Sequence, residues 1–406
     1  MIQLPPAWRS DRLKDRLRFA YGESLAAEER NDGDVKVYGS NGIVGFHDQA
    51  ITNGHTIIIG RKGSFGKVTW SDESCFPIDT TFYVDSTQTK EDLRWLFYAL
   101  DDLGLDTVNF DSAVPGLSRK VAYSLPMTFP PLPEQQLIAA CIGMSCAAID
   151  AAVATKRHQI ETLDALALAV IHQAVTQGIN ANIRFKYSGM DWLSEVPEHW
   201  QVQRIKRACE IVRGKFTHRP RNDPAYYGGE YPFVQTGDIT AASKYIRTYS
   251  QTLNDLGLSV SKMFPRGTLV MSIAANIGDV AILDLEACFP DSMVGLIPGP
   301  KTDLNFLYYM MRAMKDIMLR SAVISTQLNL NNVRIGTNFA AFPPRQEQET
   351  IAEYLDAKQQ EANAIKETLN QQIAALIAYR KSLIHEYVTG QRRISEADLS
   401  KVKAHG

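Results

Sequence analysis

The chain has 406 residues, 45% hydrophobic and 22% charged, a composition typical of a globular protein with two or three domains. Its net charge of -2 excludes an argument for nucleic-acid binding from overall basicity. No uninterrupted apolar run approaches the roughly 18 residues of a membrane span, and Met1–Pro6 lacks secretory character, so we expect a cytoplasmic protein without a membrane partner. The five cysteines show neither a Cys-x-x-Cys pair nor zinc-ligand spacing, which predicts buried, reduced thiols and no metal site.

Short β-branched runs separated by glycines predict hairpins and sheet in residues 35–70. Val35–Tyr38 leads into a turn at Gly39–Gly42, and Thr56–Ile59 leads into the glycine-rich loop Gly60–Lys67. This loop is not a P-loop, because five residues separate its outer glycines and Val68 replaces the required Ser or Thr after the lysine. We interpret it as a hairpin that presents cations to a polyanion; an ordinary solvated turn is the alternative.

Two segments of 44 residues, Glu134–Gln177 and Gln346–Thr389, predict long helices. Apolar residues recur along both at alternating steps of three and four: Ile138, Ile142, Ile149, Ala152, Ile160, Leu163, Leu166 and Val170, then Ile351, Leu355, Ala362, Ile365, Leu369, Leu376, Leu383 and Tyr387. Each helix would be about 66 Å long, against a diameter near 30 Å for one domain. We therefore predict that they pair as an antiparallel coiled coil rather than each lying on its own domain.

Residues 201–250 carry nine Lys or Arg and four Asp or Glu, interleaved with tyrosines and amides. Clustered cations attract phosphate, and Arg, Asn, Gln and Thr can read base edges, although a solvated face is the alternative. The candidate nucleic-acid-binding residues of the front part of the chain are Lys36, Tyr38, Ser40, Asn41, Arg61, Lys62, Ser64 and Lys67. Those of the later part are Arg213, Lys215, Thr217, His218, Arg219, Arg221, Tyr226, Tyr227, Gln235, Thr236 and Asn276.

The chain contains two copies of one plan. Phe129–Ala139 returns as Phe342–Ala352 at an offset of 213 residues, and Cys75–Pro77 returns as Cys288–Pro290 at the same offset. Near the start of each copy, Pro5-x-x-Trp8 and Pro197-x-x-Trp200 are only 192 residues apart, so the second copy carries 21 extra residues between Lys206 and Cys288. Motifs that are simply common in loops and turns would not recur at a shared offset, so we infer an internal duplication.

No catalytic set is evident in the sequence. Neither zinc-hydrolase nor zinc-deaminase spacing occurs around the histidines, and no cysteine or serine has a recognisable nucleophile context. Asp79 and Asp291, which follow the repeated Cys-Phe-Pro, are interpreted as sheet-edge turns rather than nuclease carboxylates. His172 and His385 lie near the predicted helix ends, where they are expected to cap carbonyl groups.

Four segments together resemble the specificity subunit of type I restriction-modification systems. They are Phe129–Gln135 and Phe342–Gln348 at the helix starts, Arg380–Gly390 at the end of the second helix, and Tyr231–Ile239. We find no clear counterpart of Gln235–Ile239 in the first copy. The resemblance implies an α+β fold in which two mixed α/β target-recognition domains form a tandem pseudo-repeat, separated and joined by two long helices.

The domains expected from this resemblance are residues 1–130 and 181–341 for target recognition, with the spacer helices in 131–180 and 342–406. It implies a non-catalytic subunit that binds a bipartite site on double-stranded DNA, and the 21 extra residues of the second copy predict that this site is asymmetric. The expected partners are two copies of a DNA adenine methyltransferase and a restriction/translocase subunit. They would bind S-adenosylmethionine, ATP and Mg2+, and this chain would bind no cofactor. Side chains near Glu134, Gln135, Glu347 and Gln348 are expected to point outward, to a partner or the neighbouring recognition domain. A coiled-coil scaffold that binds no DNA, or a stand-alone DNA-cleaving or DNA-modifying enzyme, remains as the alternative.

Overall fold

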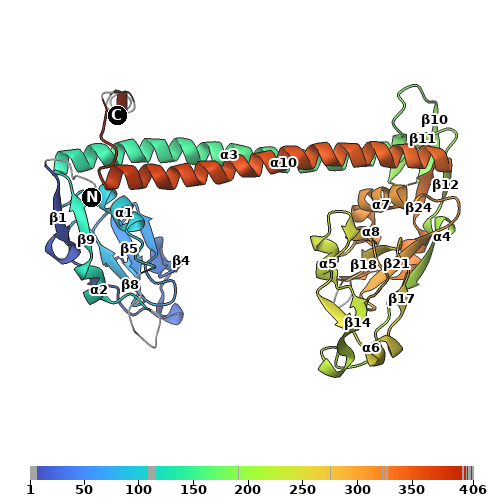
Figure 1. Cartoon of the computed structure of the whole chain (residues 1–406), viewed down its shortest axis with the longest axis horizontal. Coiled ribbons are helices and arrows are strands. Elements are labelled where there is room, and N and C mark those ends of the chain that lie inside the picture. Colours follow the sequence, from blue (N-terminus) through green and yellow to red (C-terminus); the bar gives the residue numbers. More distant parts are fainter. Residues whose placement is uncertain are drawn as a thin grey trace. The chain divides into compact units, whose positions relative to one another are not determined.

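The computed structural model describes residues 7–107, 116–190, 192–274, 276–321, 323–324, 328–395, 397–398, 400 and 404. The chain divides into two compact units (Figure 1). The first unit comprises Met1–Arg157 and Leu369–Gly406, and the second comprises His158–Thr368. The division cuts both long helices near their middles. The domain boundaries expected from the sequence, which keep each helix whole, stay a prediction.

The first unit contains three small sheets and two short helices. Two of its strands, β1 and β9, pair at the entry to the long helix, while the other sheets have the orders β2-β8-β5-β6 and β4-β3-β7. The elements are β1 (Arg9–Arg12), β2 (Ala20–Tyr21), β3 (Val35–Gly39), β4 (Gly42–His47), β5 (Thr56–Gly60), β6 (Val68–Ser71), β7 (Phe76–Pro77), β8 (Thr81–Val84), α1 (Leu93–Asp102), α2 (Arg119–Ser124) and β9 (Pro126–Phe129). The predicted hairpins at residues 35–70 are confirmed.

The second unit repeats this framework with larger sheets. Its main sheets have the orders β13-β21-β18-β19-β15 and β16-β14-β20-β17. The elements are β10 (Phe185–Met190), β11 (Leu193–Pro197), β12 (Gln201–Arg204), α4 (Ile205–Ala208), β13 (Cys209–Arg213), β14 (Tyr227–Phe233), α5 (Thr236–Ala241), β15 (Tyr245–Ile246), β16 (Gln251–Leu253), α6 (Asp255–Ser259), β17 (Met263–Phe264), β18 (Leu269–Ser272), β19 (Val280–Leu283), β20 (Ala287–Cys288), β21 (Met293–Pro298), α7 (Leu304–Ala313), α8 (Lys315–Ser321), β22 (Val323–Ile324), β23 (Leu328–Asn329), α9 (Asn332–Thr337) and β24 (Phe339–Phe342).

Equivalent strands and caps occupy equivalent places in the two units. Strand β3 runs parallel to β7, and β14 runs parallel to β20. Asp92 caps α1 and Asp303 caps α7 through the same carboxylate contact, 2.8 Å from a backbone nitrogen three residues on. The extra length of the second copy lies between β13 and β18, where α5, β15, β16, α6 and β17 accompany β14. The structure therefore supports the duplication and locates its insertion.

The predicted long helices are present as α3 (Leu132–Gln177) and α10 (Arg345–Val388). Gly178 and Gly390 follow their ends with φ of +78° and +76°, a conformation that favours glycine. Within the first unit Lys156 Nζ donates to Gln372 Oε1 at 2.6 Å, and within the second Lys366 Nζ contacts Asp164 Oδ1 at 2.8 Å. In the first unit Arg380 Nε also lies 3.6 Å from Asp150 Oδ1. An earlier position of α3 thus faces a later position of α10, which is antiparallel pairing.

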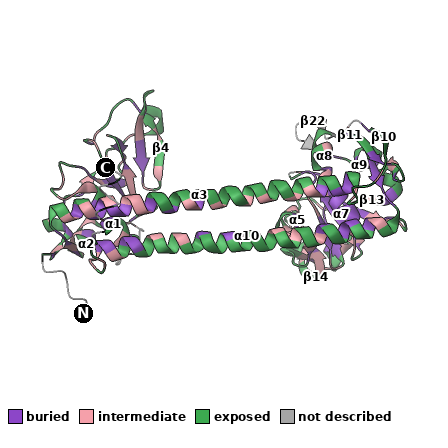
Figure 2. Ribbon diagram, turned by 90° about the horizontal axis from the view of Figure 1, so that it is seen from above, coloured by how far each residue is buried: buried purple, intermediate pink, exposed green. Residues whose placement is uncertain are grey.

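The predicted apolar seam is correct at the helix ends and at Leu369 near the middle of α10, and wrong at two inner positions. Ile138, Ile142 and Leu383 are buried, whereas Leu166 is 58% and Ile365 is 48% exposed. Figure 2 shows buried residues near the helix ends and exposed residues along the middle of both helices. A straight helix drifts relative to a strict seven-residue repeat, so a seam that was extrapolated over 44 residues leaves the contact face.

Helix α3 is more apolar than expected. By length and composition alone it could cross a membrane, with a mean hydropathy of 2.0 over 18 residues, of which 39% are buried. Core helices of soluble proteins meet the same criterion, so this is weak evidence. Single polar residues interrupt this apolar stretch without lowering its mean hydropathy much, so the average identifies the helix although no uninterrupted apolar run in the sequence is so long.

Candidate nucleic-acid interface

In the first unit, the turn between β3 and β4 lies against the glycine-rich loop between β5 and β6. Lys67 Nζ donates to the backbone oxygen of Asn41 at 2.9 Å and to Asn41 Oδ1 at 3.0 Å. Gly66 has φ +76°, and a Cβ there would lie 2.1 Å from the backbone nitrogen of Asp106, so only glycine fits. The loop is thereby held in one conformation, with Lys62, Ser64 and Lys67 exposed.

The second unit brings together the equivalent segments. Helix α5 follows β14 as the Asn41 turn follows β3, and the β18–β19 loop is equivalent to the glycine-rich loop. Asn276 Nδ2 donates to Thr240 Oγ1 at 3.1 Å, and Thr240 Oγ1 donates to Asp279 Oδ2 at 3.3 Å. Both units therefore place a segment that follows the parallel strand beside the loop between two antiparallel strands.

Strand pairing also supplies the counterpart of Gln235–Ile239 that the sequence comparison did not find. Val37 pairs with Phe76 in the first unit, and Phe233 pairs with Cys288 in the second. The turn around Ser40 and Asn41 thus occupies the place of Gln235–Ile239. The expectation of no counterpart is corrected: sequence comparison failed because one copy continues as a strand and the other as a helix.

Three candidate cations of the second unit gather around Asp291. Arg219 Nη2 lies 3.3 Å from Asp291 Oδ2, Arg221 contacts Oδ1 of the same carboxylate, and Arg213 Nε donates to its backbone oxygen at 2.7 Å. All three are exposed, as are Lys215 and Thr217. Asp291 thus orients arginines.

Among the described residues no group of three or more His, Cys, Asp and Glu could hold a metal.

A polar cavity of about 500 Å³ lies beside these arginines. Its lining includes Arg221, Tyr227, Gln235 and Gln251, over the aromatic side chains of Phe216 and Phe233. Gln235 Nε2 donates to Gln251 Oε1 at 3.1 Å. Burial raises the pKa of Tyr227, whose hydroxyl donates to the Arg221 backbone oxygen, so this tyrosine is a neutral donor at physiological pH. Sequence reasoning missed Gln251, because its place beside Gln235 depends on the antiparallel pairing of β16 with β14, which leaves no local signal.

The remaining candidate residues differ in how far their side chains are exposed to solvent. Thr236, His218 and Tyr226 are half-buried, with the His218 ring stacked on Tyr226 at 3.8 Å, and Asn276 is exposed. Lys36 and Ser40 are half-buried, and the Arg61 guanidinium lies 5.2 Å from the Tyr21 ring centroid. Tyr38 is only 4% exposed and packs with Ile58 and Cys75. Its side chain therefore fills core space, and we withdraw it as a DNA contact.

Each recognition domain is attached to its long helix by a buried glutamine. Gln135 Nε2 donates to the Pro130 backbone oxygen and Gln348 Nε2 to that of Pro343, both at 2.9 Å. Their side-chain oxygens accept from the backbone nitrogens of Asp92 and Asp303, both at 2.8 Å. Both glutamines are fully buried. Of the two expected orientations, toward a partner or toward the neighbouring recognition domain, they adopt the second, because Asp92 and Asp303 belong to those domains. Glu347 is also engaged, by Trp200 Nε1 at 3.1 Å, and Glu134 contacts Arg393 at 3.1 Å.

A sequence profile of the type I restriction modification DNA specificity domain matches residues 5–161 and again residues 197–375. The chain belongs to the family of type I restriction-modification specificity subunits. The MjaVIII specificity subunit of Methanocaldococcus jannaschii, a type I restriction enzyme component, is 22% identical over 76% of each chain. The predicted family, and with it a non-catalytic DNA-recognition role, is confirmed.

Solved structures agree with the fold. A chain from a study of complex assembly and conformational transition of the type I R-M system gives a TM-score of 0.72 at 15% identity, covering 96% of this chain and 99% of that one. The HsdS subunit from Thermoanaerobacter tengcongensis gives 0.52 at 16% identity, covering 96% and 98%. The predicted fold class, two mixed recognition domains with two long helices, is confirmed.

Proposed function

We propose that this specificity subunit recognises an asymmetric bipartite site on double-stranded DNA, with one half-site for each recognition domain. The observation that carries the proposal is that one sheet framework occurs twice with different segments beside the equivalent loop: a β-turn at Asn41 and helix α5 at Thr236–Ala241. Base recognition depends on which side chains reach the groove, so different segments select different bases. A non-DNA scaffold would have no use for such a difference.

Selection from a randomised duplex pool tests the site. We expect an enriched motif with two unlike half-sites separated by a fixed number of unread base pairs. A palindromic motif would contradict the asymmetry. No enrichment would instead favour the scaffold, and DNA altered by the chain without any partner would favour the stand-alone enzyme.

The second unit allows affinity and specificity to be separated. Replacing the exposed Lys215 by alanine should weaken binding by a similar factor on all duplexes and reduce the salt slope by about one unit for each lost phosphate contact. Replacing Gln235 by alanine should relax preference at one position of one half-site and leave the salt slope unchanged. Binding titrations at several salt concentrations measure both. An unaltered salt slope in the Lys215 variant would mean that the basic segment, residues 201–250, is a solvated face that does not contact DNA phosphates.

The proposed complex contains two copies of a DNA adenine methyltransferase and, in the restricting form, a restriction/translocase subunit. Those subunits would hold S-adenosylmethionine, ATP and Mg2+. The exposed apolar side chains of the long helices support docking there, because water-exposed leucine and isoleucine gain free energy when a partner covers them. Such a DNA-modifying complex would be cytoplasmic, with no membrane contact.

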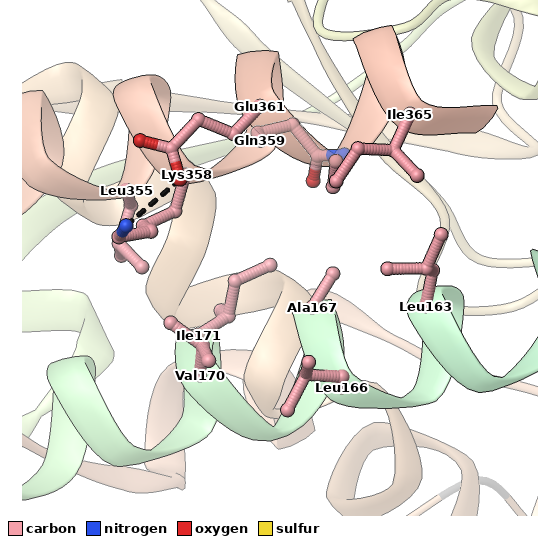
Figure 3. A pocket seen from close by; sticks show the side chains of 11 residues that line it. Leu163, Leu166, Ala167, Val170, Ile171, Leu355, Lys358, Gln359, Glu361 and Ile365 are labelled. Carbon is pink, nitrogen blue, oxygen red and sulfur yellow. Dashed lines mark hydrogen bonds and ion pairs between the residues drawn. The ribbon is translucent and has the colours of Figure 1, made fainter. Parts of the chain in front are cut away.

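An apolar groove between α3 and α10 in the second unit suits such a partner (Figure 3). Leu163, Ala167 and Ile171 of α3 face Leu355 and Ile365 of α10 across it. It encloses about 220 Å³, and the Lys358–Glu361 ion pair lies on its α10 side. An amphipathic helix places apolar residues at spacings that fit such a groove.

A charge in this groove should remove one methyltransferase from the complex. In Leu166→Glu, a carboxylate replaces an exposed leucine of the lining, and a partner helix would have to bury it unpaired. The matched control is Ala165→Glu, at an exposed α3 position that does not line the groove. Native mass measurement should give two methyltransferases with the wild type and the control, and one with Leu166→Glu. One copy on the wild type would contradict the stoichiometry.

A further inference from the structure

The β3–β4 hairpin of the first unit presents an apolar ridge to solvent. Ile43, Val44 and Phe46 are 52%, 44% and 53% exposed, respectively. All three lie on β4, the edge strand of the order β4-β3-β7, which Figure 1 draws at the margin of its sheet. An exposed edge strand with large apolar side chains is an aggregation hazard that proteins normally blunt with charge or cover with another chain. The exposed apolar side chains of β4 therefore indicate that another molecule covers this strand.

Three cations contact or adjoin this ridge. Lys36 is the cross-strand partner of Phe46, so both side chains lie on the same face of the hairpin. Lys67 Nζ is bonded to the hairpin tip at Asn41, and Arg30 Nη1 donates to the Val44 backbone oxygen at 2.7 Å. The acids Asp32, Asp34 and Asp48 flank the opposite end of the hairpin, where Asp48 contacts His47 at 3.2 Å. The tip end of the ridge therefore favours a polyanion.

DNA combines these two properties in one groove. The major groove admits a two-stranded β-ribbon between its phosphates, and the thymine methyl is the apolar group on its floor. We propose that Ile43, Val44 and Phe46 contact thymine methyl groups in one half-site, while Lys36 and Lys67 face the flanking phosphates. This inference rests on the proposed DNA-recognition function.

The second recognition domain lacks such a ridge at the corresponding place. There β16 pairs antiparallel with β14 as β4 pairs with β3, and it carries the exposed, polar Gln251 and a buried Leu253. In the segment between β14 and β16, the apolar Ile239 is buried, and the polar Gln235 and Thr236 are half-buried. One half-site is thus recognised through methyl groups and the other through hydrogen bonds. Only the first should respond to loss of a thymine methyl at the ridge.

A deoxyuridine scan of the selected duplex tests this contact on the unaltered chain. Each thymine of both half-sites is replaced in turn by deoxyuridine, which lacks the 5-methyl group but pairs identically. We expect one or two positions, all in one half-site, where binding weakens about fourfold, the factor that corresponds to about 0.8 kcal/mol for one buried methyl-sized group. If every replacement is tolerated, the proposal is overturned.

Variants then assign the sensitive position to the ridge. In Phe46→Ala and Ile43→Ala, the same deoxyuridine replacement should cost nothing further, because the contact is already absent. Phe46→Leu is the matched control and should keep the fourfold sensitivity. Both alanine variants alter half-exposed side chains, so their melting temperatures should equal that of the wild type.

Two results would contradict the ridge assignment. Undiminished sensitivity in both alanine variants would place the methyl contact elsewhere. Loss of methyltransferase association with unchanged DNA preference would make the ridge a protein-docking surface. Both results differ from failure of the proposed DNA-recognition function, because in that case the chain would select no duplex from the pool.

Discussion

Replacing Asp356 by alanine is expected to destabilise the second unit by about 2 to 3 kcal/mol. Asp356 Oδ1 accepts from Lys244 Nζ at 2.5 Å and from Tyr309 OH at 2.6 Å. The Lys244 side chain is 13% exposed, so the variant leaves an ammonium nearly buried without its counterion. This is at or below the roughly 3 to 5 kcal/mol of a broken buried pair, because the Asp356 side chain is itself 45% exposed.

The loss should depend on pH in a defined direction. Burial lowers the pKa of Lys244, and the hydrogen bond to Asp356 opposes this effect. Without Asp356 the pKa in the folded chain falls further below that in the unfolded chain. The unfolded chain then holds more protons between the two pKa values, so the free energy of unfolding of the variant rises with pH. The difference from the wild type should therefore shrink in alkaline solution.

Urea unfolding of the full chain at neutral and alkaline pH measures both effects. Glu361→Ala is the matched control, because it removes an ion pair from the same helix in which both side chains are exposed. We expect that control to leave the free energy of unfolding almost unchanged, because an exposed ion pair contributes little. Equal stabilities of the two variants would mean that Lys244 finds another partner or reaches water.

Shortening both long helices by one turn should shift the preferred gap between half-sites by one or two base pairs. Both α3 and α10 run unbroken across the boundary between the units. Deletion of residues 158–161 and 368–371 removes about 6 Å from each helix, against about 3.4 Å per base pair. It keeps both the Lys156–Gln372 and the Asp164–Lys366 contacts. Each base pair also rotates the groove by roughly 35°, so DNA twist resists a larger shift.

Repeating the duplex selection with the shortened chain measures the gap directly. Both half-site sequences should stay the same, because no recognition loop is touched. Replacing the same eight residues by alanine keeps the helix lengths and should keep the original gap. A stable, DNA-binding deletion variant with an unchanged gap would mean that the helices hold subunits but do not measure DNA.

Local patterns predicted the long elements well and the site only in part. Pro133 and Gly178 fix the limits of α3 through backbone chemistry that acts over one turn, and the observed helix begins and ends within two residues of the predicted bounds. The equivalence of Ser40–Asn41 with Gln235–Ile239 depends on parallel pairing with distant strands, which leaves no local signal.

Burial of individual polar side chains was equally hidden. Gln135 and Gln348 lie at the start of helices, where exposed polar residues are common, and only the packed domain supplies the backbone groups that bind them. Tyr38 looked accessible beside a turn, but its ring enters a small core with Ile58 and Cys75. For both glutamines and for Tyr38, contacts with residues distant in sequence determine the burial of the side chain, which the local sequence does not predict.

The paired glutamines also bear on how such a chain can evolve. Gln135 and Gln348 share two contacts, one with a proline backbone oxygen and one with an aspartate backbone nitrogen. The joint between a recognition domain and its helix is therefore built in the same way in the two copies. Recombination between genes within the Phe-Pro-Pro segment would replace the whole surface that faces DNA and leave that joint intact. A lineage could thus acquire a new DNA target in one recombination event. If the surface that faces DNA were continuous with the supporting helix, a new target would instead require many successive mutations.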